Sequence, residues 1–142
     1  MKTKTLNNEA ETLDFAKYYA KSLKPGDIVA LYGNLGAGKT VFAKGLAFIL
    51  DKKIKVRSPS FLIMKVYELN NKKIKRLCHI DAYRLKTASE LEAVGASDFL
   101  GAKDTVCVIE WPKNVQNILK KYKNVKKIKI EIMEEDKRRI TY

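Results

Sequence analysis

The chain has 142 residues, of which 46% are hydrophobic and 32% charged, a size and composition suited to one domain with one hydrophobic core. No apolar run approaches the length of a membrane-spanning helix, and residues 1–5 lack the apolar segment of a signal peptide. We therefore expect a cytoplasmic protein with no membrane contact. Cys78 and Cys107 lie in apolar, strand-like runs without a C-x-x-C spacing, which gives no support to a disulfide, a zinc site or a redox centre.

The formal net charge of +13 at pH 7 comes mainly from lysines, which cluster at residues 52–53, 72–73 and 120–129. Such a surface attracts RNA or an acidic partner. However, surfaces that read RNA usually interleave arginine and aromatic residues, and these clusters mostly do not. We therefore favour a solvated surface or an acidic protein partner over direct contact with RNA.

The chain begins with a short strand-like stretch and then shows the pattern of a helix. Asn8 with Glu11 three residues later resembles a capping box, and Pro25-Gly26 should end the helix. Residues 27–32, which are apolar after Asp27, predict a buried strand. The apolar residues of the helix recur at helical spacing, at Leu13, Ala16, Ala20 and Leu23.

The next stretch, residues 33–40, fits the phosphate-binding pattern G-x-x-x-x-G-K-[ST] at every fixed position, and a helix is predicted over residues 40–50. Its glycines let backbone N–H groups approach a polyphosphate closely, and the start of the helix favours an anion. Lys39 would reach the outer phosphates, and the Thr40 hydroxyl would hold Mg²⁺. A glycine-rich turn with a chance Lys-Thr pair is the alternative. The expected nucleotide-binding residues are Gly33, Asn34, Leu35, Gly36, Ala37, Gly38, Lys39 and Thr40.

After this helix the sequence predicts a short strand at residues 54–56 and then a stiff loop. Pro59 removes a backbone donor and forces Ser58 into an extended conformation. In a nucleotide site the Ser58 and Ser60 hydroxyls could face the metal and the terminal phosphate, in the manner of a GTPase switch. Taken alone, the segment is better explained as an ordinary Ser-Pro turn. From the helix itself, we expect Phe42, Leu46 and Ile49 to face the core.

Residues 62–69 and 72–80 predict a β-hairpin around Asn70-Asn71, so the sheet should be mixed. The second arm runs through His79 to Asp81, and residues two apart on a strand share one face. The Asp81 carboxylate could bind Mg²⁺, hold a coordinating water or orient the attacking water. For His79 we favour the role of a hydrogen-bonded structural residue.

A short helix is predicted next, beginning with a capping box at residues 87–90 and ending at Gly95. A second carboxylate at a strand end follows it. The strand over residues 105–109 is almost wholly apolar and leads into Glu110-Trp111-Pro112. This is the form of a Walker B element, with Glu in place of the commoner Asp. Glu110 is therefore a second metal-site candidate, and the alternative is a chance glutamate at a strand end. Trp111 either covers the site or packs against it.

The rest of the chain predicts a helix near residues 115–122 and a terminal hairpin over residues 126–142. Arg138, on the return arm, could reach the nucleotide, although exposed charges are ordinary on an edge strand. Together the elements predict an α/β fold of the P-loop NTPase kind. We expect one domain over residues 1–142, a three-layer sandwich in which helices flank a mixed, mostly parallel sheet with antiparallel hairpins.

In their order and spacing, the motifs together resemble the TsaE (formerly YjeE) family, small bacterial ATPases needed to make threonylcarbamoyladenosine in tRNA. The resemblance implies that ATP hydrolysis resets a complex of the partner proteins TsaB and TsaD between turnovers, with TsaD transferring the threonylcarbamoyl group to tRNA. Contact of this chain with tRNA would then be indirect or weak. The motifs are residues 33–40, Ser58-Pro59-Ser60-Phe61, residues 79–85, residues 90–95 and Ile109-Glu110-Trp111-Pro112.

The resemblance also implies roles for single residues. The backbone of residues 34–39 would hold the phosphates, and Thr40 and Glu110 would bind Mg²⁺. Asp81 would sit beside the metal and the attacking water, and Arg138 would lie near the adenine. Trp111 belongs to a motif that lies next to the site in the family.

Two positions depart from the usual family pattern: Ser60 replaces Thr, and Lys113 stands where an acidic or amide residue is common. The chain has no N-K-x-D guanine-reading motif, which favours ATP over GTP. We therefore predict in-line attack of water on the γ-phosphoryl group of Mg·ATP, slow without partners, with Lys39, Asp81 and Glu110 as the catalytic residues.

Two other functions are weighed against this one. A small P-loop kinase would need a lid with several arginines, and Arg57, Arg76 and Arg84 are few and scattered. A non-enzymatic RNA-binding module would use the basic surface and keep the glycine loop as an anion site; its tRNA binding would depend steeply on salt and not on nucleotide.

Overall fold

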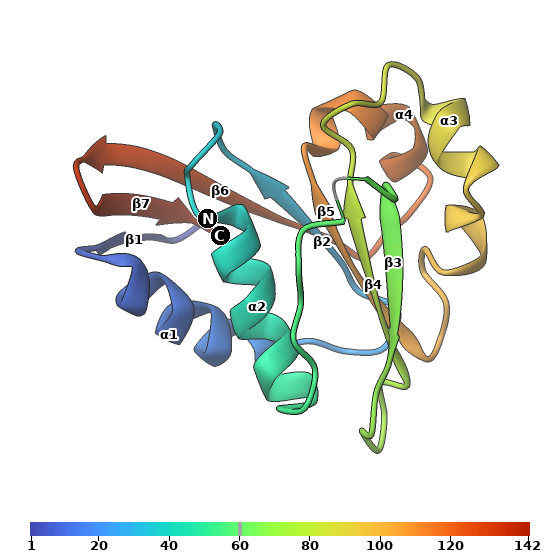
Figure 1. The fold of residues 1–142 in the computed structure, drawn as a ribbon, viewed down its shortest axis with the longest axis horizontal. Coiled ribbons are helices and arrows are strands. Elements are labelled where there is room, and N and C mark those ends of the chain that lie inside the picture. The colour runs from blue at the N-terminus through green and yellow to red at the C-terminus, as the bar shows by residue number, and fades with distance from the viewer. Residues whose placement is uncertain (60) are drawn as a thin grey trace.

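The computed structural model describes residues 1–59 and 61–142. Within them seven strands form one sheet in the order β1-β7-β6-β2-β5-β4-β3 (Figure 1). The neighbouring strands β6, β2, β5 and β4 pair in parallel, whereas β3, β7 and β1 are antiparallel to their neighbours. This confirms the predicted mixed sheet. The strands are β1 (Thr3–Leu6), β2 (Ile28–Tyr32), β3 (Met64–Glu68), β4 (Arg76–Asp81), β5 (Thr105–Glu110), β6 (Val125–Glu134) and β7 (Lys137–Thr141).

Helices cover both faces of the sheet, which confirms the predicted three-layer fold (Figure 1). None of the helices in the described part of the chain is long and apolar enough to cross a membrane. One face carries α1 (Glu9–Ala20) and α2 (Lys39–Leu50), and the other carries α3 (Ala88–Ala93), the 3₁₀ turns η1 (Ala96–Asp98) and η2 (Pro112–Val115), and α4 (Gln116–Leu119).

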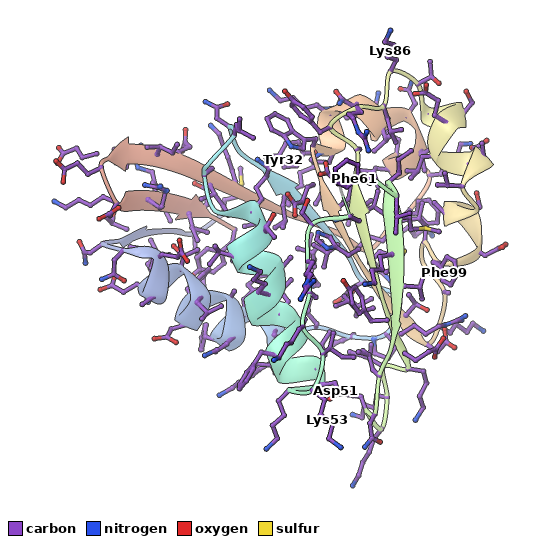
Figure 2. The ribbon with its side chains drawn as sticks, in the orientation of Figure 1. Tyr32, Asp51, Lys53, Phe61, Lys86 and Phe99 are labelled. Carbon is purple, nitrogen blue, oxygen red and sulfur yellow. The ribbon has the colours of Figure 1, made fainter. Side chains whose placement is uncertain are left out.

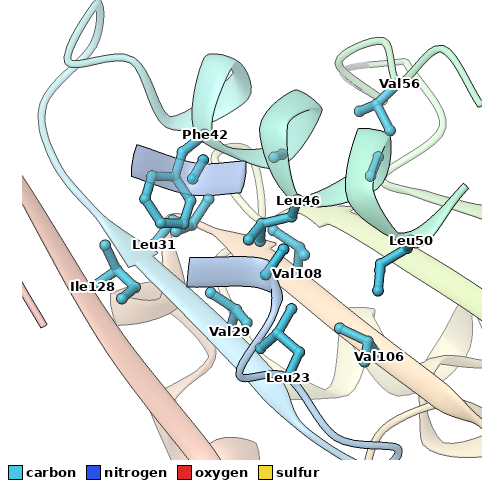
Figure 3. Close-up of a cluster of buried hydrophobic side chains, with 14 of the residues drawn as sticks. Leu23, Val29, Leu31, Phe42, Leu46, Leu50, Val56, Val106, Val108 and Ile128 are labelled. Carbon is cyan, nitrogen blue, oxygen red and sulfur yellow. The ribbon is translucent and has the colours of Figure 1, made fainter. Parts of the chain in front are cut away.

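The central strands β2 and β5 are buried on both faces because alternate residues pack against opposite helix layers. On the α2 side, Phe42 and Leu46 pack in the same cluster as Leu31, Val108 and Ile128 (Figure 3). This packing holds the first turns of α2 near the C-terminal ends of β2 and β5 (Figure 3). The phosphate-loop helix is therefore held by the core rather than by its own propensity.

Two details of the predicted elements are wrong. Ile49 is 37% exposed, and the core face of α2 instead continues from Leu46 to Leu50, which is 5% exposed. Residues 54–56 form no strand, because the Ile54 N–H donates to the Asp51 carbonyl in a turn; Val56 is buried in the core and Ile54 packs against it, partly buried. Spacing alone could not distinguish an apolar side chain that packs from one that also pairs in a sheet.

Local capping explains where two helices begin. The Asn8 side chain accepts the Glu11 N–H at 2.9 Å, as predicted, but the Glu11 carboxylate accepts the N–H of Asn7 rather than that of Asn8. The predicted capping box at Thr87 and Glu90 is confirmed: the Glu90 carboxylate accepts the Thr87 N–H at 3.2 Å, and the Thr87 side chain in turn accepts the Glu90 N–H. Both contacts satisfy N–H groups that the first helical turn leaves free.

Candidate functional site

The candidate site lies at the C-terminal edge of the parallel strands, where ligands usually bind in open α/β sheets. The loop of residues 33–38 joins β2 to α2, Asp81 ends β4, and Glu110 ends β5. In the parallel register Glu110 pairs with Leu31 on one side and with Asp81 on the other. The sheet thus brings both predicted carboxylates to the same edge as the glycine loop. Tyr32, the last residue of β2, lies toward this end, and Asp51 and Lys53 lie at the opposite end of α2 (Figure 2).

The loop needs glycine at two positions for different reasons. Gly38 has a φ of 104°, a left-handed conformation that a residue with a Cβ adopts only with strain. At Gly33 a Cβ would lie 2.7 Å from the Ile130 carbonyl oxygen of β6, so a side chain does not fit. The backbone of the loop can therefore turn tightly around a ligand while its first residue packs against the sheet.

Lys39 is 5% exposed, and its amino group is already held by the loop that precedes it. Its Nζ donates to the carbonyl oxygens of Gly33 at 2.8 Å and Asn34 at 3.0 Å. It also lies 4.1 Å from the centroid of the Trp111 ring. An ammonium group has three N–H donors, so one is left for a ligand. Burial lowers the Lys39 pKa from its ordinary value, and the charges of Glu110 and Asp81 oppose that change.

Glu110 connects three elements of the site. The Thr40 hydroxyl of α2 donates to its carboxylate, at 3.0 Å from Oε1 and 3.3 Å from Oε2. The His79 Nε2 of β4 lies 2.9 Å from the same Oε1. Glu110 is 4% exposed and His79 is completely buried. Because a buried carboxylate is costly without hydrogen bonds, Thr40 and His79 together make its position tenable.

Asp81 and Trp111 lie beside this group. Asp81 is half-buried, and its carboxylate accepts the Tyr83 N–H at 3.0 Å, so it is oriented by the turn that follows β4. The Tyr83 ring lies 4.8 Å from the Trp111 ring, centroid to centroid. Trp111 has a φ of 58°, a left-handed conformation that is uncommon for a bulky residue. Its ring is thereby placed between the lysine of the loop and the turn that holds Asp81.

Arg138 reaches the loop from β7, on the side away from Glu110. Its Nε donates to the Ala37 carbonyl at 3.2 Å and its Nη2 to the Gly36 carbonyl at 3.3 Å. A small cavity of about 60 Å³ lies here, lined by Thr12 and Glu9 of α1, by the loop and by Arg138. The prediction placed Arg138 at the nucleotide; in the structure its contacts are with the carbonyls of the phosphate loop.

A larger cavity of about 720 Å³ adjoins the other side of the loop. Its walls come from the loop, from the turn after β5 and from the open face of β6. The size is within the range of small-ligand sites. Its lining includes Tyr32, Gly33, Asn34, Trp111, Lys127 and Lys129.

The structure does not join the Ser-Pro segment to this group of side chains. Ser58 is exposed, and none of the hydrogen bonds found among the described residues involves its hydroxyl. The second predicted hydroxyl, that of Ser60, lies outside the described residues. The switch-like role of this segment stays a prediction.

The oxygen atoms at the site suit Mg²⁺. No group of three or more His, Cys, Asp or Glu side chains that could hold a metal occurs in residues 1–59 and 61–142. Mg²⁺ does not require one, because it usually takes one or two carboxylates, a hydroxyl, substrate phosphates and waters. The Thr40 hydroxyl and the carboxylates of Glu110 and Asp81 meet that description. The structure confirms that His79 is hydrogen-bonded, as expected, but sequence reasoning did not identify Glu110 as its partner; the available signal was that His79 and Asp81 share a strand face.

Comparisons with known proteins match one family over nearly the whole chain. The family described as "Threonylcarbamoyl adenosine biosynthesis protein TsaE" matches residues 6–140. The tRNA threonylcarbamoyladenosine biosynthesis protein TsaE of Bacillus subtilis is 37% identical over 142 residues, 100% of this chain and 84% of that protein. The Rickettsia typhi protein of the same name is 38% identical over 116 residues, 81% of this chain and 77% of that protein. The crystal structure of Bacillus subtilis YdiB superposes with a TM-score of 0.73 and 30% identity, covering 98% of this chain and 82% of that one.

Proposed function

The chain belongs to the TsaE family of tRNA threonylcarbamoyladenosine biosynthesis proteins, and from this premise we propose that it is a P-loop ATPase that hydrolyses Mg·ATP to drive the cycle of a TsaB–TsaD complex. One observation carries the proposal. The loop lysine, the first hydroxyl of α2 and the carboxylate at the end of β5 meet at one point, with Thr40 hydrogen-bonded to Glu110. This is the set of groups that phosphoryl transfer requires.

The first step in the proposed reaction is capture of the phosphates. Backbone N–H groups of the loop and the N-terminus of α2 would surround them, and the third N–H of Lys39 would point to the outer phosphates. The Thr40 hydroxyl donates a hydrogen bond to Glu110, which leaves the lone pairs of the hydroxyl oxygen available to Mg²⁺. Bound there, Mg²⁺ would neutralise charge on the phosphates. The Glu110 carboxylate, which is hydrogen-bonded to this hydroxyl, would hold the metal together with it.

The attacking water would be oriented by Asp81, whose carboxylate is half-buried and directed by the Tyr83 N–H. Water must approach in line with the bond that breaks, so position matters more than base strength. The Trp111 ring over Lys39 would limit the access of other water to the site.

The positions of the arginine side chains support slow turnover in the absence of partners. Transfer of a phosphoryl group is accelerated when an arginine neutralises charge in the transition state. Here Arg76 pairs with Asp104 at 3.0 Å, at the end of β4 away from the loop, and the donors of Arg138 are directed at backbone carbonyls. Within the described residues, the other three arginines make no side-chain hydrogen bond to the loop; they are Arg57, Arg84 and Arg139. We propose that TsaB or TsaD supplies the missing charge or orders the Ser58 segment. Contact with tRNA would be indirect or weak.

The experiment is steady-state ATP hydrolysis by the purified chain, alone and with TsaB, TsaD and tRNA. We expect low hydrolysis alone and stimulation by the partners, both lost in Lys39→Ala. If the partners gave no stimulation and a small metabolite accepted phosphate instead, the proposal would be replaced by a kinase. If tRNA bound with a steep salt dependence and no effect of nucleotide, an RNA-binding module would be favoured.

Two variants test the metal and water assignments. Glu110→Ala and Asp81→Ala should reduce Mg²⁺-dependent hydrolysis by about 100-fold, as loss of transition-state groups commonly does, and reduce ADP binding far less. Asp51→Ala, at the far end of α2, is a matched control that removes a carboxylate away from the loop. Wild-type turnover in both site variants would show that the site has been assigned to the wrong residues.

A further inference from the structure

His79 is a buried side chain at the site to which the proposed reaction gives no task. It lies in β4 and is completely buried, two residues before Asp81 and on the same face of the strand. Its Nε2 lies 2.9 Å from Oε1 of Glu110. Its other ring nitrogen, Nδ1, is the one buried side-chain polar atom without a hydrogen-bond partner in the described part of the chain.

The contacts of Glu110 indicate which ring nitrogen of His79 carries the proton. An ionised carboxylate only accepts hydrogen bonds, so the group that faces its Oε1 at 2.9 Å must donate. This assigns the proton to Nε2, from the hydrogen-bond network. Nδ1 makes no hydrogen bond within the described part of the chain. The imidazole is thus a fixed donor directed at one oxygen of the carboxylate.

We propose that His79 is a positioning residue that holds Oε1 of Glu110 and so leaves Oε2 as the oxygen that serves Mg²⁺. Oε1 accepts from both His79 and Thr40, whereas Oε2 is met only by Thr40, at the longer distance of 3.3 Å. The inference rests on the proposed function, because it takes the metal to lie at Thr40 and Glu110. It adds a residue that touches neither the metal nor the nucleotide.

Core packing alone does not account for this histidine. A leucine or phenylalanine would fill the space without leaving a buried polar atom unpaired, which is costly. Neighbouring positions on the same face of β4 and β5, Leu77 and Val108, are apolar. In the described part of the chain, His79 and Glu110 are the buried polar residues on this face of β4 and β5, and they contact each other. The cost of burying His79 with Nδ1 unpaired is explained if the protein needs the Glu110 carboxylate in one orientation.

The test compares His79→Leu, which removes the donor, with His79→Gln, whose amide N–H can take the place of Nε2–H. Cys78→Ala is the matched control, because Cys78 is buried on the same strand but on the opposite face. Mn²⁺ binding to the ADP-loaded protein is measured by electron paramagnetic resonance. ADP binding in EDTA and thermal unfolding are measured alongside.

We expect His79→Leu to weaken Mn²⁺ binding by about tenfold or more, the usual effect of losing the partner of a metal-holding group. ADP binding in EDTA should change less than about twofold, and His79→Gln should regain most of the Mn²⁺ affinity. Cys78→Ala should lower the unfolding temperature without changing either affinity.

Two results would overturn the inference while leaving the proposed function intact. In one, the wild-type protein binds ADP and Mn²⁺, and His79→Leu binds Mn²⁺ equally well. In the other, His79→Leu and His79→Gln lose Mn²⁺ binding and metal-free ADP binding to the same extent, which would indicate a structural role. A wild-type protein that binds neither ADP nor Mn²⁺ would refute the proposed function itself.

Discussion

Replacing Gly45 with alanine tests how α2 is seated, because two opposing effects can be compared in magnitude. Gly45 lies where α1 crosses α2, the two helices that cover one face of the sheet. A Cβ at this position would lie 2.6 Å from the Ala16 Cβ and 2.8 Å from the Leu13 carbonyl oxygen. Both atoms belong to α1 itself and cannot rotate away, so the helices would have to move apart.

Helix propensity alone predicts that Gly45→Ala stabilises the protein by about 1 kcal/mol. Overpacking of a close contact typically costs about 1–3 kcal/mol. Here the cost should be near the upper end, since contact distances below 3 Å involve backbone and Cβ atoms. We therefore expect a net loss of roughly 1–2 kcal/mol, or a fall of about 3–7 °C in Tm for a chain of this size.

The assay is thermal unfolding followed by far-ultraviolet circular dichroism, with urea unfolding to obtain the free energy. Lys44→Ala, an exposed change one residue away on α2, is the control and should change stability by less than about 0.5 kcal/mol. The double variant Ala16→Gly/Gly45→Ala removes the closest contact, so its loss of stability should be smaller than the sum of the two single losses.

A rise in Tm for Gly45→Ala would refute this reasoning, because it would show that propensity outweighs the contact. Strict additivity in the double variant would refute it as well. Since α2 begins with Lys39 and Thr40, a displaced helix should also weaken nucleotide binding in Gly45→Ala.

Three further predictions concern charge and the loop. Hydrogen bonds from Arg76 hold the pKa of Asp104 below its ordinary value of 3.8, so the unfolded chain binds more protons than the folded one. The stabilisation is therefore present above about pH 4 and is lost as the pH falls. Arg76→Gln should lower Tm more at pH 7 than at about pH 3, and an equal fall at both would contradict this. Trp111, the single tryptophan, should change its fluorescence when Mg·ADP is titrated, and Lys39→Ala should abolish the change. Arg138→Leu should weaken ADP binding roughly tenfold, because two carbonyls of the loop lose their hydrogen-bond donor. Wild-type affinity measured by calorimetry would show that Arg138 does not stabilise the loop for binding.

The parts of the site that the sequence predicted are those with local signals. The glycine pattern of residues 33–40 is contiguous, and Asp81 and Glu110 each follow an apolar run, so the strands could be placed without knowing their neighbours. Parallel strands then necessarily bring such ends to one edge of the sheet. The terminal hairpin and the hairpin of β3 and β4 were likewise predictable from alternation and turn residues.

The parts that were missed depend on contacts between distant segments. The bond from His79 to Glu110 requires the register of β4 on β5, which no local pattern contains. Residues 54–56 have the composition of a strand, but they pair with none of the strands; Val56 is buried in the core and Ile54 packs against it. Ile49 fits the helical spacing as well as Leu50 does, and only the position of the sheet beneath α2 decides which of the two is buried.

The way in which the loop holds Lys39 has a consequence for affinity. A free lysine side chain loses considerable rotamer entropy when a ligand fixes it. Here contacts within the protein, to the carbonyls of Gly33 and Asn34 and to the ring of Trp111, already restrict the amino group. That entropy is lost when the protein folds, together with the cost of burying a cation, and not when a nucleotide arrives. Such pre-organisation makes the fold less stable than it could be and binding correspondingly tighter.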